Sequence, residues 1–193
     1  MWEIDVWDPL PIDDVAALLN GAPFRWWVSG GRALELHVGR SWRSHEDTDV
    51  GVLGSEVSRV AKRLSGWELA VAAGGRLSGW HGRPLQPGEN NVWAGRTAWE
   101  IDFTVGADSD DEWVYRRYPA IRRPWSAAVL LSARNVPYLA PELQLLFKSK
   151  TARPKDHDDA EVVIPVLGRA ARAFLEENLP AGHAWRRLLH DAG

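Results

Sequence analysis

The sequence contains no cysteine, and this absence removes several kinds of chemistry at once. Disulfide frameworks, thiolate nucleophiles and zinc sites built on cysteine are excluded. The six histidines are scattered without a His-x-x-x-His pair, so a zinc enzyme is not expected either. The chain also lacks a Gly-x-Ser-x-Gly elbow, a Walker-type lysine loop and a Gly-x-Gly-x-x-Gly fingerprint. The enzyme classes that these motifs mark therefore find little support.

A long apolar run and an excess of basic residues are missing as well. No stretch of eighteen apolar residues occurs, so no transmembrane helix and no membrane partner are expected. The acidic start, followed by Pro9 and Pro11, does not resemble a signal peptide, and we expect a cytoplasmic protein. A formal net charge of −3 disfavours a dedicated nucleic-acid binder, although a local basic patch remains possible.

The amino-acid composition is typical of a globular protein. Its 193 residues, 45% hydrophobic and 25% charged, are enough to bury a core. Tryptophan is unusually frequent, with 12 residues, and packing of large aromatic side chains is the favoured explanation. The alternative is that a few of them line a pocket and stack on a flat base or a sugar face.

Helix and strand patterns alternate through the first two thirds of the chain, which predicts a mixed α/β fold. The expected helices there are 12–20, 32–38 and 57–64, and the expected strands are 24–28, 48–53, 67–73, 76–80, 91–93 and 98–105. Ranges 113–116, 128–132 and 136–138 are expected as short strands or extended links. Helices are predicted over 142–150, 156–167, 169–179 and 185–190, with Pro165 kinking or ending the second. We expect a catalytic core over 1–138 and a C-terminal helical part over 139–193 packed on it.

The segment from residue 28 to residue 50 is the most informative. Gly30 and Gly31 follow a strand and precede a helix, so backbone can approach a phosphate at the positive end of the helix dipole. Asp47 and Asp49 stand two residues apart in an extended segment, which puts both carboxylates on one face, about 7 Å apart at their roots. Mg²⁺ prefers such oxygen ligands together with the phosphates of a nucleotide. The segment therefore predicts a magnesium and nucleotide site.

A third carboxylate is expected from the strand that contains Glu100 and Asp102. Alternation places these two side chains on one face of the strand and Ile101 and Phe103 on the other. We favour Asp102, as a ligand of a second metal ion about 4 Å from the first, as a general base, or as both in turn. Glu100 remains the alternative.

Each of these features is weak alone, since acidic turns and Gly-Gly turns are common, but their order and spacing are specific. The sequence resembles the nucleotidyltransferase superfamily with a polymerase-β-type core, and within it the aminoglycoside and lincosamide nucleotidyltransferases. The matching residues are Gly30-Gly31, Glu35, Gly39-Arg40, Arg43, His45, Asp47 and Asp49, with further likeness at 99–103, 138–142, 145–148 and 153–156. Arg32 stands where the family often has Trp, and Glu35 where Asp is common, which puts the shape of the substrate pockets in doubt.

The resemblance implies a mixed twisted sheet flanked by helices, and two Mg²⁺ ions held by Asp47, Asp49 and Asp102. It also implies transfer of a nucleoside monophosphate, expected to be AMP from ATP, to a hydroxyl of a small aminoglycoside- or lincosamide-like compound, with release of pyrophosphate. A toxin-like enzyme acting on tRNA or protein, and a non-catalytic nucleotide-binding module, are the alternatives. A homodimer is plausible, because related enzymes often share acceptor pockets between subunits.

Basic residues beside these motifs are candidates for binding the nucleotide. Arg40 and Arg43 are expected to clamp phosphates through bidentate hydrogen bonds; the alternative is surface charge that balances nearby glutamates. The stretch from Lys148 to Asp159 resembles toxin-type and abortive-infection nucleotidyltransferases, and this resemblance implies that Lys148 reaches an NTP phosphate, with Asp156 and Asp159 near the metal site or orienting the lysine. The alternative for this stretch is a solvated basic turn between two helices.

A second basic cluster follows residue 115, with aromatic residues between its members. It consists of Arg116, Arg117, Arg122 and Arg123. Such a cluster can grip RNA or an anionic acceptor. A solvated strand edge is the favoured explanation, because the chain as a whole is negatively charged.

Overall fold

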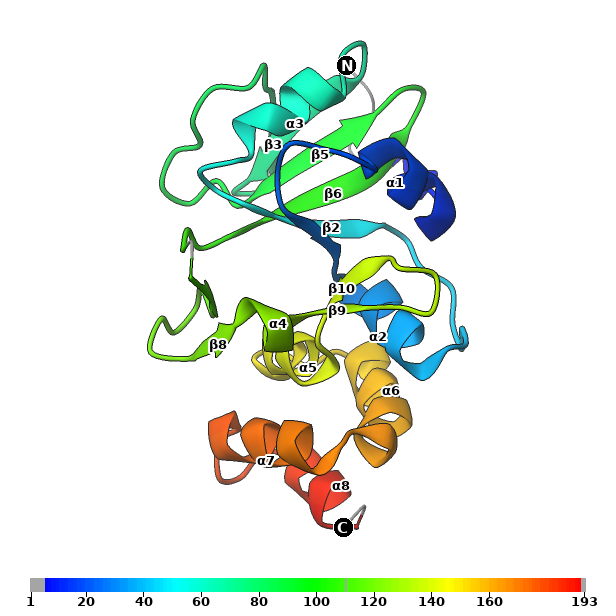
Figure 1. Cartoon of the computed structure of the whole chain (residues 1–193), viewed down its shortest axis with the longest axis vertical. Coiled ribbons are helices and arrows are strands. Elements are labelled where there is room, and N and C mark those ends of the chain that lie inside the picture. The colour runs from blue at the N-terminus through cyan, green and yellow to red at the C-terminus, as the bar shows by residue number, and fades with distance from the viewer. Residues whose placement is uncertain (1–5, 110, 192–193) are drawn as a thin grey trace.

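The computed structural model describes residues 6–109 and 111–191, in which helices enclose one large mixed sheet (Figure 1). The helices are α1 (Ile12–Leu19), α2 (Gly30–Val38), α3 (Ser58–Arg63), α4 (Trp125–Ala128), α5 (Pro141–Ser149), α6 (Pro154–Val163), α7 (Arg169–Asn178) and α8 (Trp185–Asp191). The strands are β1 (Trp26–Val28), β2 (Asp49–Leu53), β3 (Glu68–Ala73), β4 (Arg76–Gly79), β5 (Asn91–Gly95), β6 (Trp99–Gly106), β7 (Glu112–Val114), β8 (Arg122–Pro124), β9 (Val129–Leu131) and β10 (Pro137–Leu139).

The main sheet has the strand order β4-β3-β5-β6-β2-β1-β10-β9, and β7 and β8 form a separate hairpin. The central strands β2 and β6 run parallel and place Asp49 opposite Asp102. Because alternate residues of a strand point to opposite faces, Asp49, Gly51 and Asp102 share one face while Val50 and Phe103 point to the other. The predicted mixed α/β fold is therefore confirmed, and its register brings two candidate carboxylates together.

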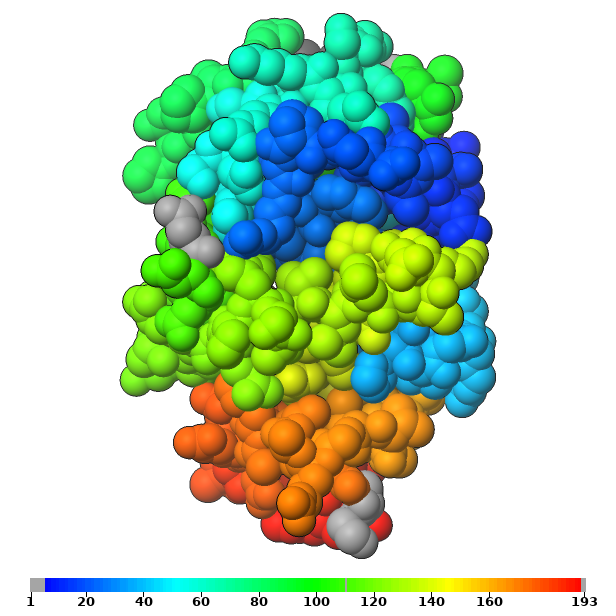
Figure 2. Space-filling view, in the orientation of Figure 1, coloured from blue at the N-terminus to red at the C-terminus, as the bar shows by residue number. Residues whose placement is uncertain are grey.

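Each face of the sheet is covered by its own hydrophobic core. On one face, Val50, Val52 and Phe103 pack with Val15 of α1 and Val60 of α3. On the other face, β1 and the end of β2 pack with the helices that follow residue 140. Figure 2 shows α7, in orange, at one end of the molecule, with green and yellow segments between it and the N-terminal half. The carboxylates thus lie on the face that these later helices approach.

The sequence predicted most elements but misplaced several ends. Helix α2 begins at Gly30, two residues earlier than expected, and α6 begins at Pro154. Proline fits the first turn of a helix because its missing N–H has no partner there. Pro165 ends α6 in a short 3₁₀ turn, as expected. Strand β8 and helix α4 were not predicted, because three or four residues carry too little periodic signal.

The later helices stay closely tied to the rest of the chain. Strand β10 pairs with β1, and the side chain of Gln144 on α5 accepts a hydrogen bond from the backbone of Gly30. The predicted division between 1–138 and 139–193 falls within β10 and stays a prediction. Among the described residues, no helix has the length and apolar character needed to cross a membrane.

Candidate active site

The turn between β1 and α2 is packed directly against the side chains of the candidate site. Gly30 has a left-handed φ of +67°, and a Cβ at this position would overlap Oδ2 of Asp49. A Cβ on Gly31 would likewise overlap the guanidinium of Arg43. The Gly30 N–H donates to Oε1 of Gln144 at 2.9 Å, so helix α5 fixes the turn. Both glycines are thus needed for backbone and side chains to come this close.

Three aspartates gather where β2 and β6 run side by side. Burial, together with the charges of Asp47 and Asp102, raises the pKa of Asp49 well above its ordinary value. Burial also raises the pKa of Asp102 to about 7, against the hydrogen bonds that it accepts. The amide nitrogen of Asn91 donates to both carboxylate oxygens of Asp102, each at 2.9 Å. A cation bound here would relieve the repulsion between the carboxylates.

The donors present fit a magnesium ion, although they do not form a ready-made cage. Over residues 6–109 and 111–191, no three histidine, aspartate or glutamate side chains converge as a metal cluster. Mg²⁺ does not need such a cage, since it binds through one or two carboxylates, substrate phosphates and water. Asp47 and Asp49 line one cavity together, while Asp102 lines a different cleft. The alternative, Glu100, is occupied by Arg96, whose Nη2 lies 2.6 Å from its carboxylate.

A cavity of about 380 Å³, here called the cationic cavity, adjoins Asp47 and Asp49. Its basic lining residues are Arg43, Arg117, Lys148, Arg153 and Lys155. The first turn of α2 contributes Gly30 and Gly31 to the same wall. Guanidinium and ammonium groups beside a helix N-terminus are the usual partners of phosphate oxygens. The cavity therefore suits a polyphosphate chain next to the carboxylates.

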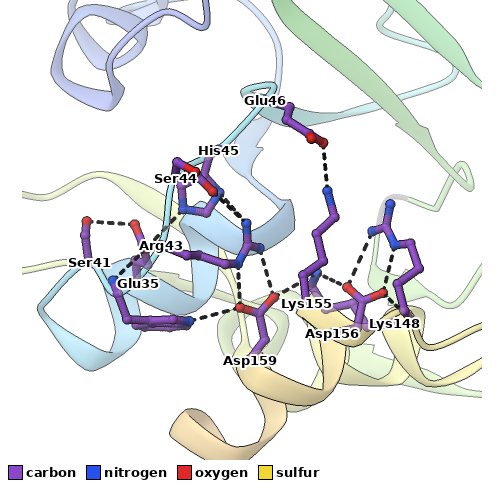
Figure 3. Close-up of polar contacts among 12 residues, drawn as sticks. Glu35, Ser41, Arg43, Ser44, His45, Glu46, Lys148, Lys155, Asp156 and Asp159 are labelled. Atoms are coloured by element: carbon purple, nitrogen blue, oxygen red, sulfur yellow. Dashed lines mark hydrogen bonds and ion pairs between the residues drawn. The ribbon is translucent and has the colours of Figure 1, made fainter.

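Three cations of this cavity, Arg43, Lys148 and Arg153, are held in place by two buried aspartates of α6 (Figure 3). Arg43 donates to both oxygens of Asp159, at 2.8 and 2.9 Å. Lys148 lies 2.6 Å from Asp156 and 3.0 Å from Asp159. Burial alone would raise the pKa of both aspartates. The hydrogen bonds and positive charges around them outweigh burial, so the pKa of Asp159 is lowered and the pKa of Asp156 falls well below its ordinary range. The two aspartates thus hold the ammonium group of Lys148 in place, and its contact with a phosphate stays a prediction.

His45 extends the same network towards α2. Its Nε2 lies 3.0 Å from Oε1 of Glu35, and its Nδ1 lies 3.2 Å from Nη1 of Arg43. Since Arg43 can only donate, Nδ1 accepts and Nε2 carries the proton. Burial is the largest cause that lowers the pKa of His45, so the ring stays neutral. Glu35 also accepts from Ser41, at 2.8 Å, and the predicted structural role of His45 fits this chain of contacts.

Arg40 lines a different cavity from Arg43 and Lys148, the other residues that we expected to bind the nucleotide. Helix α2 ends at Gly39 in the left-handed conformation, which turns the chain away before Arg40. The Arg40 side chain is exposed and lines a different cavity, between α2 and the loop at residues 132–134. The expected phosphate contact of Arg40 is therefore not supported, whereas Arg43 and Lys148 both reach the cationic cavity.

A smaller cavity of about 240 Å³, here called the aromatic cavity, shares Gly30, Asp49 and Gln144 with the cationic one. Its walls include Trp27, Trp113 and Phe147. Sequence reasoning missed Gln144, because a buried polar residue among apolar neighbours shows no pattern of its own, and it missed Asn91, because an asparagine at the start of a strand after a polar loop is common. The arginines that follow residue 115 do not act as one cluster. Arg116 and Arg117 line the aromatic cavity, whereas Arg123 forms an ion pair with Glu142 at 3.0 Å.

Comparison with known proteins places this site in context. A family model described as aminoglycoside-2''-adenylyltransferase matches residues 11–74, the part that contains Gly30, Gly31, Asp47 and Asp49. A search of curated protein sequences gave no match.

Two solved structures resemble the whole fold. The lincosamide adenylyltransferase LnuA, with lincomycin bound, has a TM-score of 0.57 at 17% identity and covers 79% of this chain and 93% of its own. ANT(2'')-Ia in complex with adenylyl-2''-tobramycin has a TM-score of 0.56 at 14% identity and covers 86% of this chain and 95% of its own. The resemblance inferred from the motif is thereby confirmed. The chain has the fold of these two antibiotic adenylyltransferases, and its residues 11–74 match the model of the aminoglycoside-2''-adenylyltransferase family.

Proposed function

We propose that the protein is a magnesium-dependent nucleotidyltransferase that moves AMP from ATP to a hydroxyl of a small molecule and releases pyrophosphate. The observation that carries this proposal is that two carboxylates in register on neighbouring strands, Asp49 and Asp102, lie beside the cationic cavity, which Asp49 lines. A further cleft beside Asp102 provides space for an acceptor next to a carboxylate. The fold shared with two adenylyltransferases supports the same reaction class.

Each residue then has a task that its position allows. Asp47 and Asp49 would hold Mg²⁺, which stabilises charge on the attacking and leaving oxygens when bound. Lys148 and Arg43 bind the leaving phosphates, and the turn at Gly30 supplies backbone N–H groups. Asp102, with a pKa near 7, takes the proton of the acceptor hydroxyl. The acceptor oxygen forms a bond to the α-phosphorus as the bond to the pyrophosphate oxygen breaks, and pyrophosphate leaves with the electron pair.

Magnesium-dependent binding of ATP tests this proposal without knowledge of the acceptor. In thermal unfolding, ATP with Mg²⁺ at 100 times its Kd is expected to stabilise the protein by about 2.7 kcal/mol. The stabilisation should vanish when Mg²⁺ is chelated, and also in the Asp47→Asn, Asp49→Asn double variant. A shift of equal size in that variant, or none with any nucleoside triphosphate in the wild type, would reject a nucleotide site at these carboxylates.

Substitution of the turn glycine gives a second test. Gly30→Ala should lower the rate of AMP transfer by about 10²-fold, because the new methyl group overlaps Asp49 and displaces it. Gly39→Ala is the matched control: Gly39 also has a left-handed φ, of +80°, but a Cβ there has no neighbour within 4 Å. Both variants carry roughly 1 to 2 kcal/mol of backbone strain, so only the contact with Asp49 differs. Equal rates for the two variants would argue against the assigned role of Asp49.

A further inference from the structure

A separate cleft adjoins Asp102 on the face of the sheet that Asp49 and Asp102 share, over strands β3 to β6. It has a volume of about 290 Å³ and is formed by the β3–β4 hairpin at residues 72–77, by Asn91 and Trp93 of β5, and by Asp102 of β6. We call it the hairpin cleft. Asp47 and Asp49 are not among its lining residues, and Asp102 is not among those of the cationic cavity, within the part of the chain that the structure describes. The paired carboxylates therefore stand between two different spaces.

The position of the hairpin cleft suits the attacking group of an in-line transfer. In such a transfer, the nucleophile approaches the phosphorus from the side opposite the leaving group. The cationic cavity, with Lys148 and Arg43, suits the departing pyrophosphate on the Asp49 side. Asp102 lies in register with Asp49 on the neighbouring strand, and it is the only carboxylate among the described residues of the hairpin cleft. A hydroxyl in this cleft can reach the carboxylate that takes its proton.

The lining of the hairpin cleft is mostly apolar. Ala72 and Leu77 contribute aliphatic surface, and the partly exposed Trp93 contributes a ring. That ring is fixed by edge contacts with Trp7, at 4.9 Å between centroids, and with Trp99, at 5.8 Å. A rigid aromatic side chain with an apolar body is suited to the apolar face of a sugar or a similar ring. The cleft is therefore built for an acceptor with an apolar side.

The charges of the hairpin cleft oppose a highly cationic acceptor. Apart from Asp102, whose carboxylate is engaged by Asn91, the only charged side chain among its described lining residues is Arg76. A polyamine entering this space would bury several ammonium groups with one carboxylate, Asp102, as their partner, and unpaired buried charges are strongly unfavourable. A neutral compound, or one with a single charge, avoids this cost.

We infer that the hairpin cleft binds the acceptor, and that the acceptor is a hydroxyl compound with an apolar face and at most one positive charge, unlike a polycationic amino sugar. This inference rests on the proposed function. In this arrangement the β3–β4 hairpin selects the acceptor. The nucleotide binds in the cationic and aromatic cavities, which share Gly30 and Asp49.

Three acceptor probes test the substrate class. Tobramycin carries several amines, lincomycin carries one basic amine, and p-nitrophenyl β-D-glucopyranoside carries no charge. With Mg²⁺ and labelled ATP, kcat/KM for lincomycin or the glucoside is expected to exceed that for tobramycin by at least tenfold. Transfer to tobramycin with equal or greater efficiency, or transfer to none of the three while ATP still stabilises the protein, would overturn the inference. Loss of magnesium-dependent stabilisation by ATP in the wild type would instead reject the proposed function itself.

Variants of the hairpin test the location. Ala72→Phe fills the cleft from one wall and should lower kcat/KM for the preferred probe by at least tenfold, while the thermal shift with ATP and Mg²⁺ is unchanged. Ser78→Phe is the control, because Ser78 is exposed on the same hairpin and does not line the cleft. Should Ala72→Phe not fold, Ala72→Cys provides the only thiol in the chain, which can be alkylated with N-benzylmaleimide after folding. Unchanged transfer in the filled or alkylated protein would place the acceptor elsewhere.

Discussion

Asp49→Asn is expected to lower kcat/KM for AMP transfer on the order of 10³-fold, because it removes a charged ligand from the point where charge develops during transfer. The same substitution should leave the fold intact. Glu177→Gln, which removes an exposed carboxylate of α7 far from the site, is the matched control and should retain full activity. The measurement is steady-state transfer from labelled ATP at saturating Mg²⁺. Activity of Asp49→Asn within tenfold of the wild type would contradict the assignment.

The same variant should be more stable than the wild type when metal is removed. Burial and the charges of Asp47 and Asp102 disfavour the ionised form of Asp49, so its ionisation at neutral pH destabilises the folded protein. Asparagine keeps the shape and removes the charge. We expect the free energy of unfolding in EDTA at pH 8 to rise by roughly 1 kcal/mol, an amount typical of relieved repulsion in a partly solvated cluster. Loss of stability on this substitution would show that the carboxylates do not repel one another.

The pH dependence of this effect has a defined sign. The pKa of Asp102 is raised from about 3.9 in the unfolded chain to about 7 in the folded protein, mainly by burial. The folded state therefore binds the proton more tightly, and this carboxylate costs stability as pH rises from about 4 to about 7. Asp102→Asn should flatten the decline of melting temperature over that range in EDTA. An unchanged slope would contradict the raised pKa.

Strand alternation could predict that Asp47 shares a face with Asp49, and Glu100 with Asp102. The joint role of Asp47, Asp49 and Asp102 in binding metal stays a prediction. Alternation could not choose between Glu100 and Asp102, since both lie on the same face of β6. That choice depends on a contact within the β5–β6 hairpin, where Arg96 approaches Glu100 to 2.6 Å and engages its carboxylate. The strand register then leaves Asp102 opposite Asp49. The contact between Arg96 and Glu100 and the register of β2 with β6 form only in the folded chain, so the periodicity of the sequence cannot predict them.

Other features of the site were beyond prediction for a related reason. Arg40 and Arg43 are close in sequence, but the left-handed turn at Gly39 sends them to different cavities. Gln144 sits among buried leucines of α5 and is visible as a site residue only through its hydrogen bond to Gly30. Turn geometry and packing between helices decide such placements, and both depend on the assembled fold.

The largest loss of stability is expected from Asp159→Asn. The Asp159 side chain is fully buried and accepts hydrogen bonds from Arg43 and, at 3.1 Å, from the indole nitrogen of Trp42; Lys148 lies 3.0 Å away. Removing the charge leaves two cations less compensated in a buried place, which costs about 3 to 5 kcal/mol. For a chain of this size, the melting temperature should fall by roughly 10 °C. Differential scanning calorimetry with and without ATP is the measurement.

Two controls separate this network from surface charge. Asp158→Asn removes an exposed carboxylate one residue away on the same helix and should change stability by less than about 0.5 kcal/mol. Glu46→Gln breaks the ion pair between Glu46 and Lys155. Because the Glu46 side chain is 85% exposed, we expect the free energy of unfolding to change by less than about 1 kcal/mol. If Asp159→Asn is no more harmful than these two, the contacts drawn in Figure 3 do not stabilise the fold.

Acid provides an independent check on Asp159. Hydrogen bonds and charge from Arg43 and Lys148 outweigh burial and hold the pKa of Asp159 below its ordinary value. A carboxylate with a lowered folded-state pKa stabilises the protein fully above the unfolded value of about 3.9 and loses that effect as pH falls through the folded value. The difference between wild type and Asp159→Asn should therefore be constant near neutral pH and shrink below about pH 4. A difference that persists undiminished at pH 2 would mean that asparagine harms the packing of α6 and that the charge of Asp159 contributes little. Its role in holding Arg43 and Lys148 towards the phosphates would then lose its support.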